Sequence, residues 1–255
     1  MLSRLMANIG GPTQSKRRLI METVNSILLY GSEIWGDALV AKTRRKVLES
    51  VQRTAALRVA SAYRTVSGAA VLVISGVVPV DLLALERKEA WELKKQNVNF
   101  CATELRSPTI QRWNRWQIED YGTWTKKLIS NIEDWIKKKF GETNYFLTQF
   151  LAGHGYFRKY LHRMGKINDP SCIYCDCIND DAEHTFFNCV RWQADMNSLR
   201  SQIGHFTTTN IIEKMLESER NWNKVKEYVE RILRLKKADL DRVQRDEENG
   251  GPRRG

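Results

Sequence analysis

Apolar residues in this chain recur mostly at intervals of three and four, the spacing of a helix that buries one face. The first such pattern follows a turn at Gly10-Gly11-Pro12, with Thr13 or Ser15 as the candidate N-cap. Its apolar positions are Leu19, Ile20, Val24, Ile27 and Leu28. Alternation with a period of two, which is typical of strands, is scarce. The pattern therefore predicts an all-α protein.

Further helices are expected along the whole chain. They fall at about 42–62, 69–74, 80–93, along a charged helical stretch from about 108 to 140, on both sides of 153–155, and at about 192–203, 210–216 and 222–243. Thr65 or Ser67 can cap the helix over 69–74, and Gly76 can end it. The charged tail at 246–255 is expected to be disordered.

Composition favours a folded protein. Hydrophobic residues make up 42% of the 255 positions, and eight residues are tryptophan. The four tryptophans within 108–140 are better explained as core anchors than as platforms for stacking bases. No apolar run reaches transmembrane length, and the first residues lack the apolar stretch of a signal peptide. We expect an intracellular protein with no membrane partner.

One cysteine and histidine motif carries clear chemistry. Cys172 and Cys175 are two residues apart, and His184 and Cys189 follow within the next fourteen positions. Three thiolates and one imidazole can fill the four positions of a tetrahedral Zn²⁺ ion, which leaves none for a reactive water. The motif predicts a structural zinc knuckle. Cys177, in the same loop, is an alternative ligand, and cysteines unrelated to any metal remain a further alternative.

Positive charge is distributed unevenly around this motif. The net charge is +11, and residues 1–65 carry 11 Lys/Arg against 4 Asp/Glu. Residues 171–189 carry no Lys/Arg and 4 Asp/Glu. The zinc motif itself is therefore a poor phosphate ligand, and a polyanion would contact the basic segments before and after it. An ordinary solvated basic surface is the alternative.

The two glycines of Gly153-His154-Gly155 permit a tight turn, which could either expose or bury the imidazole of His154. A general base assisted by His162 and Asp169 is one interpretation. A hydrogen-bonded histidine at a hinge fits better, because the sequence offers no second acid pair or open metal site.

Several strings, in this order, resemble the C-terminal part of reverse transcriptases from arthropod non-LTR (LINE-type) retrotransposons. They are Gly10-Gly11-Pro12 with Lys16-Arg17-Arg18, Tyr30-Gly31-Ser32-Glu33-Ile34-Trp35, Ala62-Tyr63-Arg64-Thr65-Val66-Ser67, Leu151-Ala152-Gly153-His154-Gly155 and the zinc motif. The resemblance extends from residue 1 to about residue 240. Together the strings are specific, although each alone is weak.

The resemblance implies a polymerase thumb, a helical linker and a zinc knuckle that together hold template RNA and target DNA, in a nuclear protein. Backbone contacts on the thumb side would come from Lys16, Arg17, Arg18, Arg53 and Arg64. Arg158 and Lys159 would lie with His154 at the base of the knuckle. The polymerase domain upstream would be a further partner.

The chain departs from that family in its carboxylates. Polymerisation needs palm carboxylates that hold two Mg²⁺ ions, and the family's aromatic-Ala-Asp-Asp motif is absent. Asp180-Asp181 is the one Asp-Asp pair, and it lies inside the zinc motif. We therefore expect a segment that is non-catalytic by itself, or else a zinc-stabilised protein-interaction module. Its expected divisions are 1–65 (thumb-like), 66–145 (linker), 146–192 (zinc knuckle), 193–245 (C-terminal helices) and 246–255 (tail).

Overall fold

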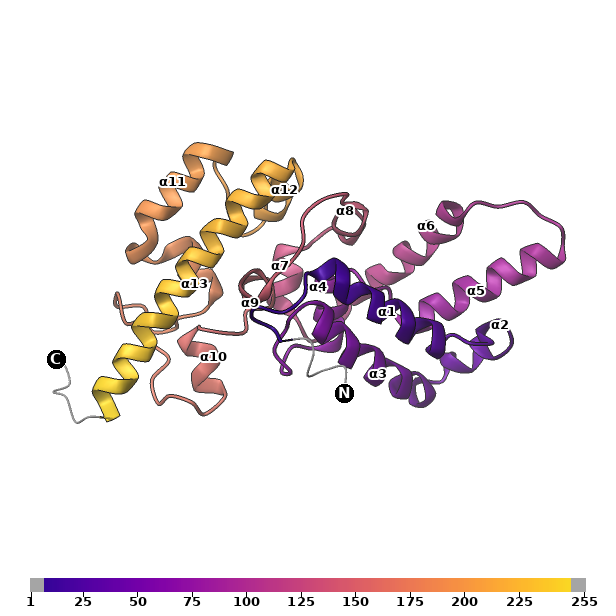
Figure 1. Cartoon of the computed structure of the whole chain (residues 1–255), viewed down its shortest axis with the longest axis horizontal. Helices are drawn as coiled ribbons and strands as arrows, with labels where there is room; N and C mark the ends of the chain where they lie inside the picture. The colour runs from indigo at the N-terminus through magenta and orange to yellow at the C-terminus, as the bar shows by residue number, and fades with distance from the viewer. Residues whose placement is uncertain (1–6, 249–255) are drawn as a thin grey trace. The chain divides into compact units, whose positions relative to one another are not determined.

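The computed structural model describes residues 7–248, and over this range the chain forms helices, turns and loops without any strand (Figure 1). The prediction of an all-α protein is confirmed. The chain divides into two compact units, Met1–Thr148 and Gln149–Gly255. Among the described residues no single helix is long and apolar enough to cross a membrane, although the bent pair α4 (Gly68–Ser75) and α5 (Val80–Lys95) meets the length and composition requirement together.

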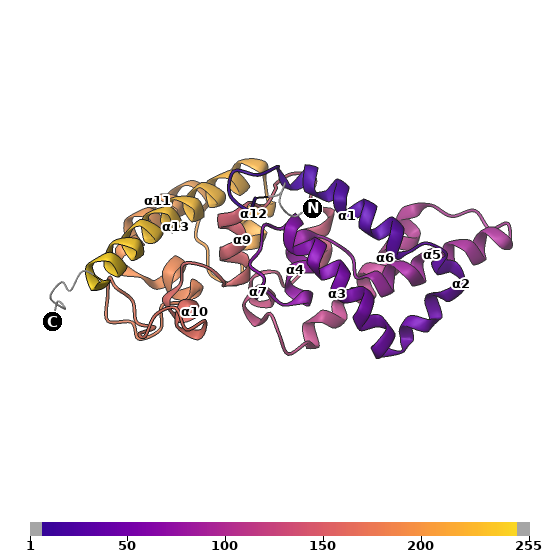
Figure 2. The same cartoon turned by 60° about the horizontal axis from the view of Figure 1, so that its bottom comes forward.

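The first unit is a helical bundle. Its elements are α1 (Gln14–Leu28), α2 (Ser32–Trp35), η2 (Gly36–Val40), α3 (Lys42–Val59), α4 (Gly68–Ser75), α5 (Val80–Lys95), α6 (Ala102–Trp113), η3 (Asn114–Ile118), α7 (Thr123–Leu128) and α8 (Ile132–Lys137). Helix α1 lies along α3, which also packs on α4, and α5 packs against α2 and α6 (Figure 2).

Helix α4 forms the centre of this bundle. The Ser67 hydroxyl accepts a hydrogen bond from the backbone N–H of Ala70 at 3.2 Å, and Gly76 ends the helix with a φ of 68°. Side chains all round α4 are buried, which is the pattern of a core helix. The indole N–H of Trp135 donates to the carbonyl oxygen of Val73 at 2.8 Å and so fixes α8 on this core. The predicted cap and stop residues are confirmed.

The buried face of α1 is only partly the one that its apolar pattern predicts. Of the predicted apolar positions, Ile20, Val24 and Leu28 are half-buried. Gln14, Arg17 and Met21 are buried, whereas Leu19 and Ile27 are 63% and 72% exposed. Burial of Arg17 is possible because its guanidinium finds backbone carbonyl acceptors inside the bundle. The side chain of Thr13, the N-cap residue, makes no capping hydrogen bond.

The charged stretch 108–140 forms several short helices. Gly122, at a φ of 76°, and Asn131, whose side chain accepts from the N–H groups of Glu133 and Asp134, begin α7 and α8 separately. Three tryptophans of this stretch are almost completely buried: Trp113, Trp116 and Trp135. Their predicted role as core anchors is confirmed.

The second unit packs short helices and one loop against the long helix α13 (Glu219–Glu248). Its other elements are α10 (Arg158–Arg163), η4 (His184–Asn188), η5 (Val190–Trp192), α11 (Gln193–Ile203) and α12 (Ile211–Leu216), while α9 (Tyr145–Ala152) begins in the first unit. Helix α13 extends past Asp246, where the sequence predicts a disordered tail; residues 249–255 lie outside the described range. The unit has an aromatic core that includes Phe150, Phe186, Phe206 and Tyr228.

Candidate metal centre

Cys172 and Cys175 lie in a tight turn that directs both sulfurs to the same side. The backbone N–H of Cys172 donates to the carbonyl oxygen of Cys177 at 2.8 Å and closes the turn. The N–H of Tyr174 points at the sulfur of Cys172 at 3.4 Å. Such N–H groups favour a sulfur that carries negative charge.

His184 and Cys189 come from the opposite side, on a single π-helical turn over His184–Asn188. The backbone N–H of Cys189 donates to the carbonyl oxygen of His184 at 2.8 Å, which fixes the two ligands relative to one another. The carboxylate of Asp181 accepts the N–H of His184 at 2.9 Å. One π-helical turn is a rare local geometry that is often found at functional sites.

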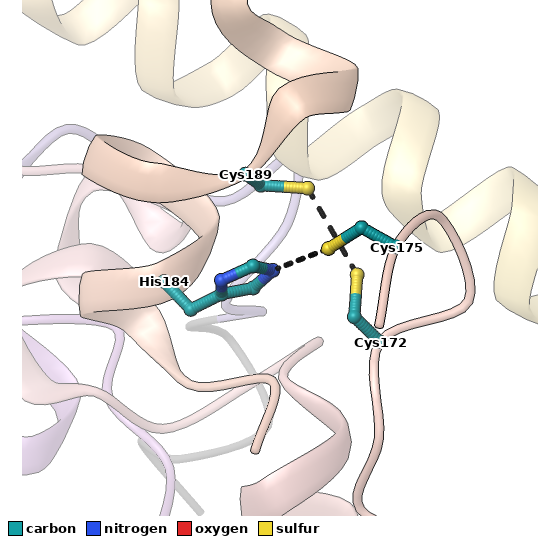
Figure 3. A group of neighbouring side chains, drawn as sticks. All are labelled: Cys172, Cys175, His184 and Cys189. Atoms are coloured by element: carbon teal, nitrogen blue, oxygen red, sulfur yellow. Dashed lines mark hydrogen bonds between the residues drawn. The ribbon is translucent and has the colours of Figure 1, made fainter. Parts of the chain in front are cut away.

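The four side chains converge on one point (Figure 3). All four potential ligand atoms lie within 4.8 Å of one another. The sulfurs of Cys172 and Cys189 are 3.9 Å apart, and Nε2 of His184 is 3.4 Å from the sulfur of Cys175. Two sulfurs bonded at about 2.3 Å to one tetrahedral ion are separated by about 3.8 Å. The donor set therefore fits a four-coordinate metal ion.

The electrostatics of the thiols also suit a bound cation. The hydrogen bond from Cys172 to Cys189, together with burial, raises the pKa of Cys172 to about 12, and the same hydrogen bond lowers the pKa of Cys189. Burial raises the pKa of Cys175 as well. Several thiolates cannot coexist in this small volume without a positive charge, and a bound divalent ion supplies that charge. Binding of a metal ion by these four side chains would therefore release protons.

Cys177 lies outside the group. Its sulfur contacts the carbonyl oxygen of Asn179 at 3.4 Å, and its backbone closes the turn around Cys172. The cluster consists of Cys172, Cys175, His184 and Cys189, here called the CCHC cluster. The sequence alone had left Cys177 open as an alternative.

A buried ion pair supports the CCHC cluster from behind. Lys236 Nζ lies 2.5 Å from Oδ1 of Asp180, and each side chain is 1% exposed. Asp180 also accepts from the hydroxyl of Thr185 at 2.9 Å and from the N–H of Arg158 at 3.0 Å. These bonds join α13, the π-helical turn and the start of α10. Buried charges need such partners, because an uncompensated one is very costly.

Helix α13 holds residues 172–189, here called the metal loop, at two more points. The hydroxyl of Tyr174 donates to the carboxylate of Asp239 at 2.9 Å, and the hydroxyl of Tyr228 donates to the carbonyl oxygen of Phe186 at 2.8 Å. Sequence analysis missed this support. The signal was present, because Lys236 continues the three-and-four spacing of Val225, Val229 and Ile232, and so occupies a core position.

Comparison with known proteins identifies the relatives. A Pol polyprotein of the type-1 retrotransposable element R1 2 from Nasonia vitripennis is 22% identical over 261 residues, which covers 93% of this chain and 62% of the relative. An R1 Pol polyprotein from Bradysia coprophila is 24% identical, over 64% of this chain and 18% of the relative. A putative 115 kDa protein in the element R1DM of Drosophila melanogaster is 24% identical, over 92% of this chain and 25% of the relative.

The homologues of this chain are R1 retrotransposon Pol polyproteins of arthropods. The predicted resemblance to arthropod non-LTR elements is thus confirmed at low identity, and it supports a retroelement origin. The chain spans between 18% and 62% of the length of these three R1 relatives. No family model matches the chain, and no solved structure matches it significantly.

The seven cations that the resemblance to non-LTR reverse transcriptases implied as nucleic-acid contacts differ in accessibility. Lys16, Arg18 and Arg64 are exposed. Arg53 is half-buried and donates to the carbonyl oxygens of Arg64 and Val66, so it fixes the loop after α3.

Arg17 and Arg158 are buried, at 2% and 8% exposure. Arg17 donates to the carbonyl oxygens of Ala7, Pro12 and Arg58, and Arg158 pairs with Asp169 at 3.4 Å. A guanidinium so enclosed serves the fold and is not presented to a phosphate. Lys159 is exposed but forms an ion pair with Asp181 at 3.0 Å.

His154 is half-buried and hydrogen-bonded, which agrees with that part of the better of the two sequence interpretations. Its ring stacks on Tyr160 with 4.7 Å between centroids, and Arg163 donates to its Nε2 at 3.0 Å. Burial and the charge of Arg163 lower the pKa of His154 to about 4. A general base needs a pKa near the working pH and an accessible lone pair, and His154 offers neither.

Proposed function

We propose that this chain is a nucleic-acid-binding segment of a retroelement reverse transcriptase, stabilised by one structural Zn²⁺ ion. It would hold template RNA or target DNA through the phosphate backbone, with little readout of base sequence. The relatives support this proposal, because homology to retrotransposon Pol polyproteins suggests an interaction with nucleic acid. Cys172, Cys175, His184 and Cys189 would be the zinc ligands.

Unpaired cations in the first unit carry this proposal. They are Lys16, Lys42, Arg44, Lys46, Arg58 and Arg64, all of them exposed. None of the six forms an ion pair within the described residues. Exposed cations without protein partners are the groups that displace counterions from a phosphate backbone.

Many cations of the second unit are paired with acids, although Lys166, Arg191 and Arg220 are exposed and form no ion pair within the described residues. Lys214, Lys224 and Lys237 pair with neighbouring acids on their own helices or turns, and Arg231 pairs with Asp195. The metal loop itself is acidic. We therefore assign the phosphate contacts to the first unit, and to the CCHC cluster the role of ordering the second unit.

Polymerase chemistry is not part of the proposal. Asp180 directs both carboxylate oxygens to protein donors, and Asp181 caps the π-helical turn and pairs with Lys159. Both carboxylates therefore bind protein donors that stabilise the fold, and they are not free to bind Mg²⁺. The residues of this chain would position nucleic acid for carboxylates supplied elsewhere in a Pol polyprotein.

A salt titration with matched variants tests the proposal. The zinc-loaded chain should bind RNA and DNA oligonucleotides with an affinity that falls steeply between 50 and 200 mM salt. The triple variant Lys42→Gln, Arg44→Gln, Lys46→Gln should bind at least about tenfold more weakly and lower the salt slope by about 2.

The triple variant Lys214→Gln, Lys224→Gln, Lys237→Gln is the control, because it removes the same net charge from paired positions. It should stay within about twofold of the wild-type affinity. Equal losses in both triple variants would show only a general charge effect, and salt-independent or absent binding of the wild-type chain would refute the proposal.

Exposed apolar residues favour a second candidate, a surface that docks another protein segment. Ile34 on α2 and Val40 on η2 are 80% and 79% exposed, and they lie close to each other along the chain. The upstream part of an R1 Pol polyprotein would be the partner. Ile34→Asp and Val40→Asp should then abolish capture of that upstream segment and leave oligonucleotide affinity unchanged. Charge reversal at Lys16 and Arg18 should weaken oligonucleotide binding and leave capture of the upstream segment unchanged.

A further inference from the structure

A small basic cavity lies where the first turn of α1 meets the chain after α8. It has a volume of about 200 Å³. Three cations line it: Arg18, Lys138 and Lys139. Gln14 and Ser15 contribute the first turn of α1, and Glu142 is the single acidic residue in the lining.

The amino end of α1 has neither a capping side chain nor an acidic side chain of its own first turn. No acidic residue occupies the first turn of this fifteen-residue helix, and the N-cap Thr13 makes no side-chain capping bond. The first N–H groups of a helix, together with its dipole, favour a negative group. Here the carboxylate of Glu142 accepts the N–H of Ser15 at 3.2 Å. The Glu142 oxygen therefore occupies a position that an oxygen of a bound anion could take.

Gln14 provides an independent sign that a ligand is missing. Its side chain is 3% exposed and lines the cavity. Its Oε1 accepts the backbone N–H of Thr143 at 2.9 Å, which fixes the orientation of the amide. Its Nε2 is therefore a buried donor, and it has no hydrogen-bond partner within the described structure. Buried polar groups are nearly always satisfied, so an unused donor beside a cavity indicates an acceptor that binds there.

Positive charge is concentrated around this donor. Arg18 donates to the carbonyl oxygen of Ser75 at 3.2 Å, and Lys138 donates to that of Trp135 at 3.0 Å. Burial and the charge of Arg18 lower the pKa of Lys138 to about 7. Two cations held this close in a partly dry site destabilise one another, and a bound anion relieves that repulsion.

We propose that this cavity binds one phosphate group of a nucleic-acid backbone, with Arg18, Lys138 and Lys139 as cationic partners and Gln14 Nε2 as a buried donor. The inference rests on the proposed function, to which it adds a defined anchoring position. Glu142 acts as an internal competitor, because phosphate binding requires its carboxylate to leave the N–H of Ser15. The phosphate adds charge-assisted hydrogen bonds, which are stronger than neutral ones.

Substitutions of the cationic and the acidic lining residues test the site in the full, zinc-loaded chain. With a single-stranded oligonucleotide of about 20 nucleotides, Arg18→Gln and Lys138→Gln should each weaken binding about tenfold and lower the salt slope by about 0.7. Lys137→Gln is the matched control, because Lys137 lies beside the cavity residues and pairs with Glu133 on the surface of α8. It should stay within about twofold of the wild type.

Glu142→Gln keeps the result falsifiable if the cation variants fold poorly. It removes the competing carboxylate and should tighten oligonucleotide binding about threefold or more, a gain that misfolding cannot produce. Inorganic phosphate is the direct probe: it should shift the side-chain amide resonance of Gln14 in the wild type and not in Lys138→Gln.

The outcomes separate this inference from the proposed function. Wild-type binding with a steep salt slope, together with cavity variants that match Lys137→Gln and no shift at Gln14, would overturn the site and leave the proposed function standing. Failure of the wild-type chain to bind any oligonucleotide would overturn both. A shift at Gln14 with tighter binding by Glu142→Gln supports both.

Discussion

Lys236 and Asp180 form an ion pair 2.5 Å long in the interior of the second unit, although they are far apart in sequence. Lys236 also donates to the hydroxyl of Thr185 at 2.8 Å, one residue after the candidate metal ligand His184. The pair thus connects the middle of α13 to the metal loop. The buried ion pair therefore fixes the long amphipathic helix α13 to the short acidic loop.

Breaking this ion pair should be strongly destabilising. Lys236→Met leaves the Asp180 carboxylate buried without its cation, so the free energy of unfolding should fall by about 3–5 kcal/mol. Lys237→Met removes a neighbouring, exposed lysine that pairs with Asp241, and should cost less than about 1 kcal/mol. Urea unfolding of both variants with zinc present measures the difference. Equal costs would contradict the buried pair.

Metal removal should loosen the second unit selectively. Cys172→Ser or a chelator should increase amide hydrogen exchange over about 165–205 and leave α1 and α3 protected, because the loop has few apolar side chains of its own. Elemental analysis should give one zinc per wild-type chain and per Cys177→Ser chain, and none for Cys172→Ser. Full protection of the loop after chelation would exclude a structural metal.

Lowering the pH should reduce the free energy of unfolding through the titration of His154. Its pKa is lowered to about 4, whereas an unfolded histidine titrates near 6.5. As the pH falls from 6.5 towards 4, the unfolded chain takes up a proton that the folded chain does not, so stability is lost over that window.

The stability difference between wild type and His154→Gln should therefore be constant above pH 7. It should shrink by on the order of 1–2 kcal/mol as the pH approaches 4. Thermal unfolding at fixed zinc concentration measures this difference and cancels the titration of other groups. A difference that stays flat with pH would mean that His154 is solvated.

A methyl group at Gly155 should be poorly tolerated. A Cβ there would lie 1.9 Å from Oε1 of Gln149, and the residue has a φ of +149°. Gly165→Ala is the control, since it also has a positive φ but meets no atom within 4 Å. The control should cost about 1–2 kcal/mol for backbone strain alone, and Gly155→Ala clearly more. Equal melting temperatures for the two variants would contradict the contact with Gln149.

Local features of the fold were predictable because their causes lie within a few residues. Ser67 and Gly76 bracket α4 by their capping chemistry, and the spacing of Cys172, Cys175, His184 and Cys189 anticipates their convergence. The tail prediction erred at 246–248, where the amphipathic pattern of α13 continues to Glu248. The break of the stretch 108–140 into short helices was missed, because Gly122 and Asn131 act there as helix starts.

The sequence by itself therefore determined the helical class, most helix positions and the four candidate ligands, since periodicity, capping and ligand spacing act over one turn or one loop. Only the tertiary structure decided which charges are accessible. Arg17 and Lys236 are buried because distant backbone carbonyls and the Asp180 carboxylate replace their water, whereas Lys16 and Arg64 remain exposed. The cost of desolvating a charge depends on every element that packs around it, and no local pattern contains that information.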